Sequence, residues 1–458
     1  MIRISLLAFL LSLSFLSSAQ KTKQINGSFA GLANEKMYLM RVSGENRKLV
    51  DTTQTDATGS FTFTLNEDAP IGIYIAIHGP GQAVELIYNH EDIQFVTTGF
   101  EGDDQVQIIN SVENLLYYDY LFLKGNNLFK MDLLRPLLDQ YPQNDPFYEQ
   151  IANQYKGLKS QLEERINTLT KENPKALATH FIRTDAPVIA PLGLSAEAEN
   201  KYLKTHYFDQ VDFNDTVLIQ SSTLTSKVVQ YMSLHQFNAD SQNALEDQLL
   251  IAVDTILTKA AVNQQTYEFL VDFLVKGFEG IGFERGLEHI ANSNQLEQFC
   301  ENTERKAKLA NKMEIIRKLA LGQRAPEFSA TDLNGNRVVL DSIKATTTVL
   351  IFWASWCPHC DEIMPIIKSY YDITTRNELE VVTFSVDDSK EDLLAAIKEG
   401  GYNWINVGEL EGWEGPIINE YGIAATPTVF ILGANKTILS KPLEKEKVRT
   451  DLKILLDK

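Results

Sequence analysis

Two cysteines separated by two residues are the strongest candidates for chemistry in this sequence. They lie in the segment Trp356-Cys357-Pro358-His359-Cys360, directly after an apolar run typical of a buried strand. The segment is predicted to open a helix, because Pro358 suits the first helical position, where its missing N–H would have no partner. At such a helix start, unpaired backbone N–H groups and the helix dipole favour a negatively charged sulfur. The pattern therefore indicates thiol-disulfide exchange.

Cys357 is predicted to be the nucleophile of this pair. The helix start and a protonated His359 can lower a thiol pKa from about 8.5 to between roughly 3.5 and 7.5. Cys360 follows one turn later on the same helix face, close enough to form a disulfide with Cys357, so we expect an exposed first sulfur and a buried second one. A purely structural bridge across four residues would constrain little chain. A zinc site would need a second pair of ligands, which the sequence lacks, so no metal and no cofactor are expected.

The sequence around the cysteines alternates between predicted strands and helices. The alternation begins after Gly322-Gln323-Arg324-Ala325-Pro326, where a helical pattern ends. Such an alternation is typical of an α/β domain. The predicted strands are Val338–Leu340, Val349–Trp353, Val381–Val386 and Thr428–Leu432, and the predicted helices are Cys357–Thr374, Lys390–Gly400 and Lys445–Leu456.

A set of motifs in residues 321–458 resembles those of a known family. The motifs are Gly322-x-x-Ala325-Pro326-x-Phe328, Asp332-Leu333-x-Gly335, Phe352-Trp353-Ala354-x-Trp356-Cys357-x-x-Cys360, Pro365 and Ala425-Thr426-Pro427-Thr428. Through them the domain resembles the thioredoxin fold and, within it, the membrane-associated TlpA/ResA branch of extracytoplasmic thiol-disulfide oxidoreductases. The resemblance implies a cis Thr426-Pro427 bond facing the cysteines, and supporting roles for Trp356, Pro358 and His359. It also implies protein disulfides as substrates and a membrane electron donor.

Two positions depart from the pattern that this resemblance implies. Thioredoxins carry a buried Asp two residues before the Trp of the strand, where this chain has Ile351. The TlpA/ResA branch often has a Glu three residues after the second cysteine, where this chain has Ile363, with Glu362 one place earlier. Proton transfer at Cys360 therefore lacks both usual carboxylates. Glu362, His359 or water are the candidates for that task.

Other redox chemistries make different demands on the same residues. A peroxiredoxin would need Thr or Ser three residues before its reactive cysteine, and Ala354 occupies that position. The Pro358-His359 pair also occurs in the strongly oxidising DsbA-type proteins, so a dithiol oxidase stays an alternative to a reductase. A further alternative is an envelope ligand-binding protein with an accessory redox domain.

The first 19 residues have the pattern of a cleavable signal peptide. Arg3 precedes an apolar run from Ile4 to Leu16, and the segment ends on small residues up to Ala19, after which cleavage is expected. No cysteine follows directly, which argues against a lipid anchor. The sequence therefore predicts a soluble protein of the periplasm or cell envelope.

The region between the signal peptide and the α/β domain is predicted to have two parts. Residues 20–105 carry short alternating segments such as Ser60–Leu65, which predict an antiparallel β-sandwich. Residues 106–315 carry apolar positions at three- and four-residue steps, which predict an α-helical region with one long helix over Asp145–Lys171. Cys300 lies in this region without a partner nearby, and no role is assigned to it. The region resembles a domain of unknown function found before such thioredoxin modules, and we expect it to position the redox domain or to form a homodimer.

The composition excludes one class of partner. The 458 residues contain 42 Lys and Arg against 61 Asp and Glu, a formal charge of −19. Such an acidic chain without a basic run is poorly suited to bind phosphates, so no nucleic-acid partner is expected. The fold class predicted for the whole chain is multidomain: an all-β sandwich, a helical region and a C-terminal α/β thioredoxin fold.

Overall fold

The computed structural model describes residues 22–79, 83–98, 106–237, 241–293 and 304–457. Contacts divide the chain into two compact units, one ending at Leu234 and the other beginning at His235. The predicted signal peptide over residues 1–19 and Cys300 lie outside the described residues. Within the described ranges, no helix combines the length and the apolar character needed to cross a bilayer.

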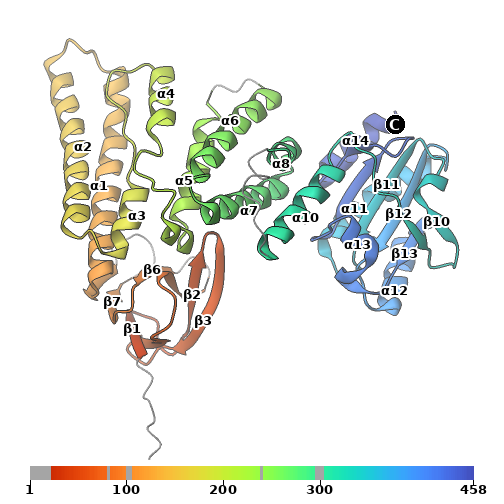
Figure 1. The fold of residues 1–458 in the computed structure, drawn as a ribbon, viewed down its shortest axis with the longest axis horizontal. Helices are drawn as coiled ribbons and strands as arrows, with labels where there is room; N and C mark the ends of the chain where they lie inside the picture. Colours follow the sequence, from red (N-terminus) through yellow and green to blue (C-terminus); the bar gives the residue numbers. More distant parts are fainter. Residues whose placement is uncertain (1–21, 80–82, 99–105, 238–240, 294–303, 458) are drawn as a thin grey trace, which may run out of the picture. The chain divides into compact units, whose positions relative to one another are not determined.

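The first unit begins with a β-sandwich (Figure 1). Two four-stranded sheets, ordered β4-β1-β7-β8 and β3-β2-β5-β6, enclose a common core that includes Phe29, Phe63 and Phe95 from one sheet and Leu39 and Tyr74 from the other. The predicted sandwich is confirmed, but it is not wholly antiparallel, because β1 and β7 pair in parallel. The strands are β1 Thr22–Phe29, β2 Lys36–Ser43, β3 Asn46–Gln54, β4 Ser60–Asn66, β5 Gly72–Ile77, β6 Ala83–Tyr88, β7 Ile93–Thr97 and β8 Val106–Asn110.

Helices complete the first unit. The chain enters α1 at Ser111, whose hydroxyl accepts a hydrogen bond from the Asn114 N–H at 3.0 Å. The Asn114 side chain in turn bonds both backbone groups of Ile87 on β6, which ties the helix to the sandwich. The predicted long helix is confirmed as α2. The helices are α1 Val112–Gln140, α2 Pro146–Glu172, α3 Leu177–Asp185, α4 Ala196–His206 and α5 Thr223–Leu234.

The second unit contains four described helices followed by the α/β domain. Glu284 at the start of α8 pairs with Lys441 of the α/β domain at 2.8 Å, and both side chains are largely buried. Leu319, just after α10, belongs to the core of the α/β domain. Helix α8 and the end of α10 therefore contact the α/β domain, and α6 and α7 pack with α8. The described helices are α6 Gln242–Ala260, α7 Gln264–Ile281, α8 Glu284–Ala291 and α10 Glu304–Lys318.

The α/β domain is built on a mixed five-stranded sheet of order β13-β12-β11-β14-β15. The central strand β11 is buried along its whole length, which explains its unbroken apolar and β-branched sequence. Helices α11 and α14 pack against each other (Figure 1), and the predicted thioredoxin-type α/β class is confirmed. The strands are β9 Ser329–Thr331, β10 Arg337–Val339, β11 Thr347–Trp353, β12 Leu379–Ser385, β13 Ile405–Gly408, β14 Thr428–Leu432 and β15 Ile438–Ser440. The helices are α11 Pro358–Ile373, α12 Lys390–Gly400, α13 Pro416–Glu420 and α14 Lys445–Leu456.

Candidate active site

The cysteine pair lies where the central strand passes into a helix. After β11 ends at Trp353, a three-residue loop leads to Cys357, which is the N-cap of α11. The Cys357 N–H donates to the Ala354 carbonyl at 3.3 Å, and the Cys360 N–H donates to the Cys357 carbonyl at 3.0 Å. Pro358 occupies the first turn of α11, as predicted. The strand and the helix therefore fix Cys357 at the positive end of the helix dipole.

The two thiols are both unbridged and both enclosed. Cys360 is 1 % exposed, which confirms the prediction for the second sulfur. Cys357 is only 5 % exposed, so the expectation of an openly exposed first sulfur is wrong. The reason is the segment before β14, since the Cys357 thiol donates to the Thr426 carbonyl at 3.3 Å and is covered on that side.

The surroundings of the two thiols give them different pKa values. Burial raises the pKa of Cys360 to about 12, and the neighbouring Cys357 adds to this effect. Burial also acts to raise the pKa of Cys357, but contacts with the Thr426 and Cys360 side chains and with the backbone N–H groups of Cys360 and His359 outweigh it. The pKa of Cys357 is lowered as a result. Cys357 is therefore the thiol that ionises first.

The other predicted site residues lie around this pair. The Thr426-Pro427 peptide bond is cis and immediately precedes β14. Trp356, in the loop before Cys357, is 59 % exposed. His359 lies beside Thr426 and Pro427 in the lining of a cavity of about 490 Å³. The structure thus brings together all seven residues that the sequence singled out.

That cavity has a charged wall. Glu362 pairs with Lys445 at 2.8 Å, and this hydrogen bond and charge lower the pKa of the Glu362 carboxyl. Both side chains are about half exposed, so the pair is solvated. The lining residues are His359, Glu362, Ile363, Thr426, Pro427, Leu443, Glu444, Lys445 and Glu446.

The two positions at which related proteins carry a carboxylate are apolar in this chain. Ile351 is fully buried in the middle of β11, and Ile363 is buried in the second turn of α11. An acid at either position would need a polar partner to offset its burial. The candidates that remain for proton transfer, Glu362 and His359, share the cavity described above.

Sequence reasoning missed a buried carboxylate that holds the active-site loop. Asp387, just after β12, is 2 % exposed. It accepts hydrogen bonds from the Ser355 N–H at 3.0 Å, the Ser355 hydroxyl at 2.6 Å and the Ser385 hydroxyl at 2.6 Å. Because β11 and β12 are parallel neighbours, their carboxyl ends meet at one edge of the sheet. A polar Ser-x-Asp ending on an otherwise apolar strand was the signal that could have identified it.

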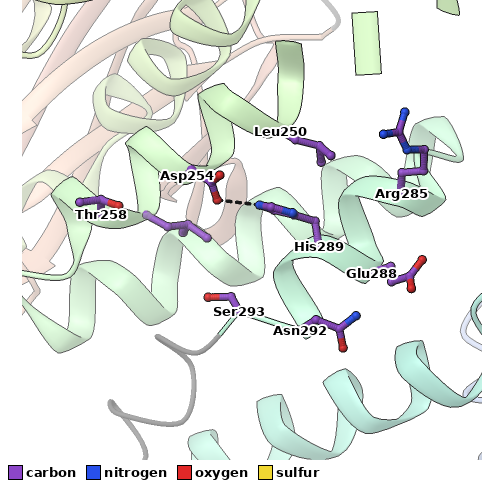
Figure 2. A pocket seen from close by; sticks show the side chains of 9 residues that line it. Leu250, Asp254, Thr258, Arg285, Glu288, His289, Asn292 and Ser293 are labelled. Atoms are coloured by element: carbon purple, nitrogen blue, oxygen red, sulfur yellow. Dashed lines mark hydrogen bonds and ion pairs between the residues drawn. The ribbon is translucent and has the colours of Figure 1, made fainter. Parts of the chain in front are cut away.

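A second cavity lies between α6 and α8 and has a volume of about 590 Å³ (Figure 2). His289 Nε2 and Asp254 Oδ1 are 2.6 Å apart in it, while Figure 2 draws the Ser293 hydroxyl pointing away from the imidazole. His289 and Asp254 form a solvent-exposed hydrogen bond, and the Ser293 hydroxyl is not directed at it. Among the described residues, no group of three or more His, Cys, Asp or Glu side chains is placed to hold a metal ion. The cysteine pair therefore remains the candidate active site.

Several known proteins are similar to parts of this chain. Residues 321–441 match the AhpC/TSA family. The thiol-disulfide oxidoreductase ResA of Geobacillus thermodenitrificans is 26 % identical over 137 residues, which cover 29 % of this chain and 77 % of that protein. ResA of Bacillus thuringiensis subsp. konkukian is 26 % identical over 144 residues, covering 31 % and 79 %. A solved thioredoxin-like protein of Bacteroides caccae is 21 % identical and covers 58 % of this chain and 97 % of its own, with a TM-score of 0.44.

The upstream regions match families without an assigned activity. Residues 24–117 match the domain of unknown function DUF4369, and residues 155–276 match the domain of unknown function DUF5106. The first of these confirms the resemblance noted for the N-terminal region. The second runs across the boundary between the two contact units. The C-terminal domain is a thioredoxin-like domain of the AhpC/TSA family, and this chain is a thiol-disulfide oxidoreductase.

Proposed function

We propose that the protein reduces disulfides of other proteins outside the cytoplasm, through Cys357 and Cys360. The observation that carries this proposal is the difference between the two thiols. Cys357 has a lowered pKa at the start of α11, while the pKa of buried Cys360 is raised to about 12. A two-step exchange needs one cysteine that ionises readily and attacks the substrate. It also needs a second cysteine that stays protonated until the mixed disulfide has formed.

The proposed reaction moves two electrons from the cysteine pair to the substrate. The Cys357 thiolate attacks one sulfur of the substrate disulfide, a mixed disulfide forms, and the released substrate thiolate takes up a proton. Cys360 then loses its proton and attacks the Cys357 sulfur, which releases the second substrate thiol and leaves a Cys357–Cys360 disulfide. Trp356, Pro358, His359, Thr426 and Pro427 support this step by surrounding the pair.

The location and the electron supply are part of the same proposal. The predicted signal peptide over residues 1–19 and the resemblance to the TlpA/ResA branch support export to the periplasm or cell envelope. A membrane electron donor then returns the Cys357–Cys360 disulfide to two thiols. The sandwich over 20–105 and the helices over 106–315 serve to position the redox domain of residues 321–458.

The test is a turnover assay of a protein disulfide such as that of insulin. We expect Cys357→Ser to abolish reduction, and Cys360→Ser to stop turnover while it accumulates mixed disulfides on Cys357. Cys300→Ser is the matched control and should retain full activity. Wild-type reduction by Cys357→Ser would overturn the proposal, and the proteins trapped on Cys360→Ser in the cell envelope would identify the substrates.

A dithiol oxidase is the second candidate, favoured by the Pro358-His359 pair between the cysteines. A group that stabilises the Cys357 thiolate stabilises the reduced pair and so raises the reduction potential. The direction of electron flow then depends on that potential, which equilibration with glutathione measures.

A further inference from the structure

Helix α1 carries a long apolar stripe on its surface. Each side chain in the stripe is at least 42 % exposed, and Phe129 is 63 % exposed. With 3.6 residues per turn, the six positions fall within about 100° of the helix circumference. The residues of this stripe are Val112, Leu115, Phe122, Phe129, Leu133 and Leu137.

The opposite face of α1 already holds the helix in its own unit. The Tyr120 hydroxyl donates to Asp185 at 2.8 Å, and the Asn127 amide donates to the Leu158 carbonyl at 2.9 Å. Met131 and Leu138 are buried in a core shared with α2. The stripe therefore adds nothing to the packing described for this unit, and an apolar surface of this extent marks an interaction site.

We propose that the stripe is the interface of a homodimer, in which α1 of one copy packs against α1 of a second copy. Leu115, Phe122 and Phe129 are spaced by seven residues, the repeat with which two helices pack along a seam. A helix of 29 residues is about 44 Å long, and a face about 11 Å wide covers on the order of 500 Å² per copy. Two such faces bury roughly 1,000 Å², the lower limit for a specific interface.

The residue pattern fits an antiparallel pair centred on Asn126. Leu115 and Leu137 lie equally far from Asn126 in the sequence, so an antiparallel pair sets these two leucines against each other. Asp119 pairs with Arg165 of α2 within its own unit. A parallel, in-register pair would set the two Lys130 ammonium groups against each other, whereas an antiparallel pair keeps them apart. An Asn at the centre of a helical seam fixes its register.

The first test is the mass of the purified full chain by sedimentation velocity at micromolar concentration. We expect a dimer for the wild type, and a rise of at least about tenfold in the dimer dissociation constant for Phe122→Glu and Phe129→Glu, equivalent to about 1.4 kcal/mol. Val229→Glu, on the exposed side of α5 in the same unit, is the matched control and should leave the constant unchanged. Circular dichroism checks that each variant is folded.

The second test measures the orientation by disulfide cross-linking in a background where Cys300, Cys357 and Cys360 are replaced by Ser. Asn126→Cys should cross-link to its own copy, and Leu115→Cys should not. A monomeric wild type, or a dimer that the Glu variants leave intact, would overturn the proposal and assign the stripe to another part of the same chain or to a lipid surface. A Leu115→Cys cross-link would overturn the antiparallel arrangement, whether or not Asn126→Cys also cross-links, because a parallel, in-register pair brings both positions next to their own copies.

Discussion

At the scale of single residues, the reactivity of the site depends on where each sulfur sits relative to backbone dipoles. Cys357 lies at the end of α11 where N–H groups are unpaired, while Cys360 lies inside the first turn, where burial dominates. The residue types and their spacing predicted this difference. The cover that Thr426 places over Cys357 could not be predicted from spacing, because it depends on a segment almost seventy residues away.

The first prediction concerns the pH dependence of alkylation. Because the pKa of Cys357 is lowered, its thiolate fraction rises with pH at lower pH than that of an ordinary thiol, whose pKa is about 8.5. Iodoacetamide should therefore label Cys357 with a midpoint below that of free glutathione, as measured by mass spectrometry of the reduced protein. Cys360, whose pKa is raised to about 12, should stay unlabelled over this range. Preferential labelling of Cys360 would contradict the assignment of the nucleophile.

The second prediction concerns the reduction potential. The helix start stabilises the Cys357 thiolate, and the sequence predicts that a protonated His359 imidazole adds to this effect. Each pKa unit is worth about 1.4 kcal/mol, or about 30 mV for two electrons. We expect a potential above the roughly −270 mV of thioredoxin and below the roughly −120 mV of DsbA. Equilibration with glutathione should show His359→Ala shifted toward more negative values, and His289→Ala unchanged as a control. A wild-type value at or below that of thioredoxin, or no response to His359→Ala, would refute this explanation.

At the scale of elements, the bounds of strands and helices were predicted best where a single apolar period ran along the whole segment. Strand β14 and helices α12 and α14 have the predicted bounds, and in α12 the caps Ser389 and Gly401 mark both ends. Helix α1 was not delimited, because its exposed stripe and its buried face together obscure the helical period. The parallel pairing of β1 with β7 was missed because strand partners far apart in sequence leave no local signal.

The third prediction tests whether Asp387, at the end of β12, fixes the loop that precedes Cys357. Asp387 at the end of β12 fixes Ser355 in the loop that precedes Cys357. Asp387→Ala would leave the donors of partly buried Ser355 and buried Ser385 without this acceptor, at a cost of about 1–3 kcal/mol in the free energy of unfolding. Denaturant unfolding should show this loss, and the alkylation midpoint of Cys357 should shift as the loop moves.

The matched control for this experiment is the next residue. Asp388 is exposed, so Asp388→Ala removes the same charge without removing a buried hydrogen-bond acceptor. It should leave both the unfolding free energy and the alkylation midpoint within experimental error of the wild type. Equal effects of the two variants would show that Asp387 acts through charge alone and not by holding the loop.

At the scale of the whole molecule, the sequence predicted the three kinds of structure but not how they group. Composition and periodicity distinguish a β-sandwich from helices and from an α/β domain. They do not report that α6 to α10 fall into one compact unit with the α/β domain, while α1 to α5 fall into the unit of the sandwich. That grouping depends on single contacts such as Glu284 with Lys441 and on the buried position of Leu319.

The last prediction follows from that grouping and concerns the isolated redox domain. A fragment that begins at Leu321 lacks Leu319, which is buried in the α/β core, and Ile315, which packs against that core. Losing a buried leucine costs about 2–5 kcal/mol, so this fragment should melt at a lower temperature than one that begins at Glu304 and retains α10. Both fragments should exchange thiols with a small generic disulfide, because the cysteine pair and its surroundings lie after Leu321. Both should lose activity on the natural substrate if the upstream region positions the redox domain.

Equal melting temperatures of the two fragments would show that α10 does not stabilise the domain. A Glu304 fragment that cannot fold or exchange thiols would show that the redox site depends on the rest of the chain.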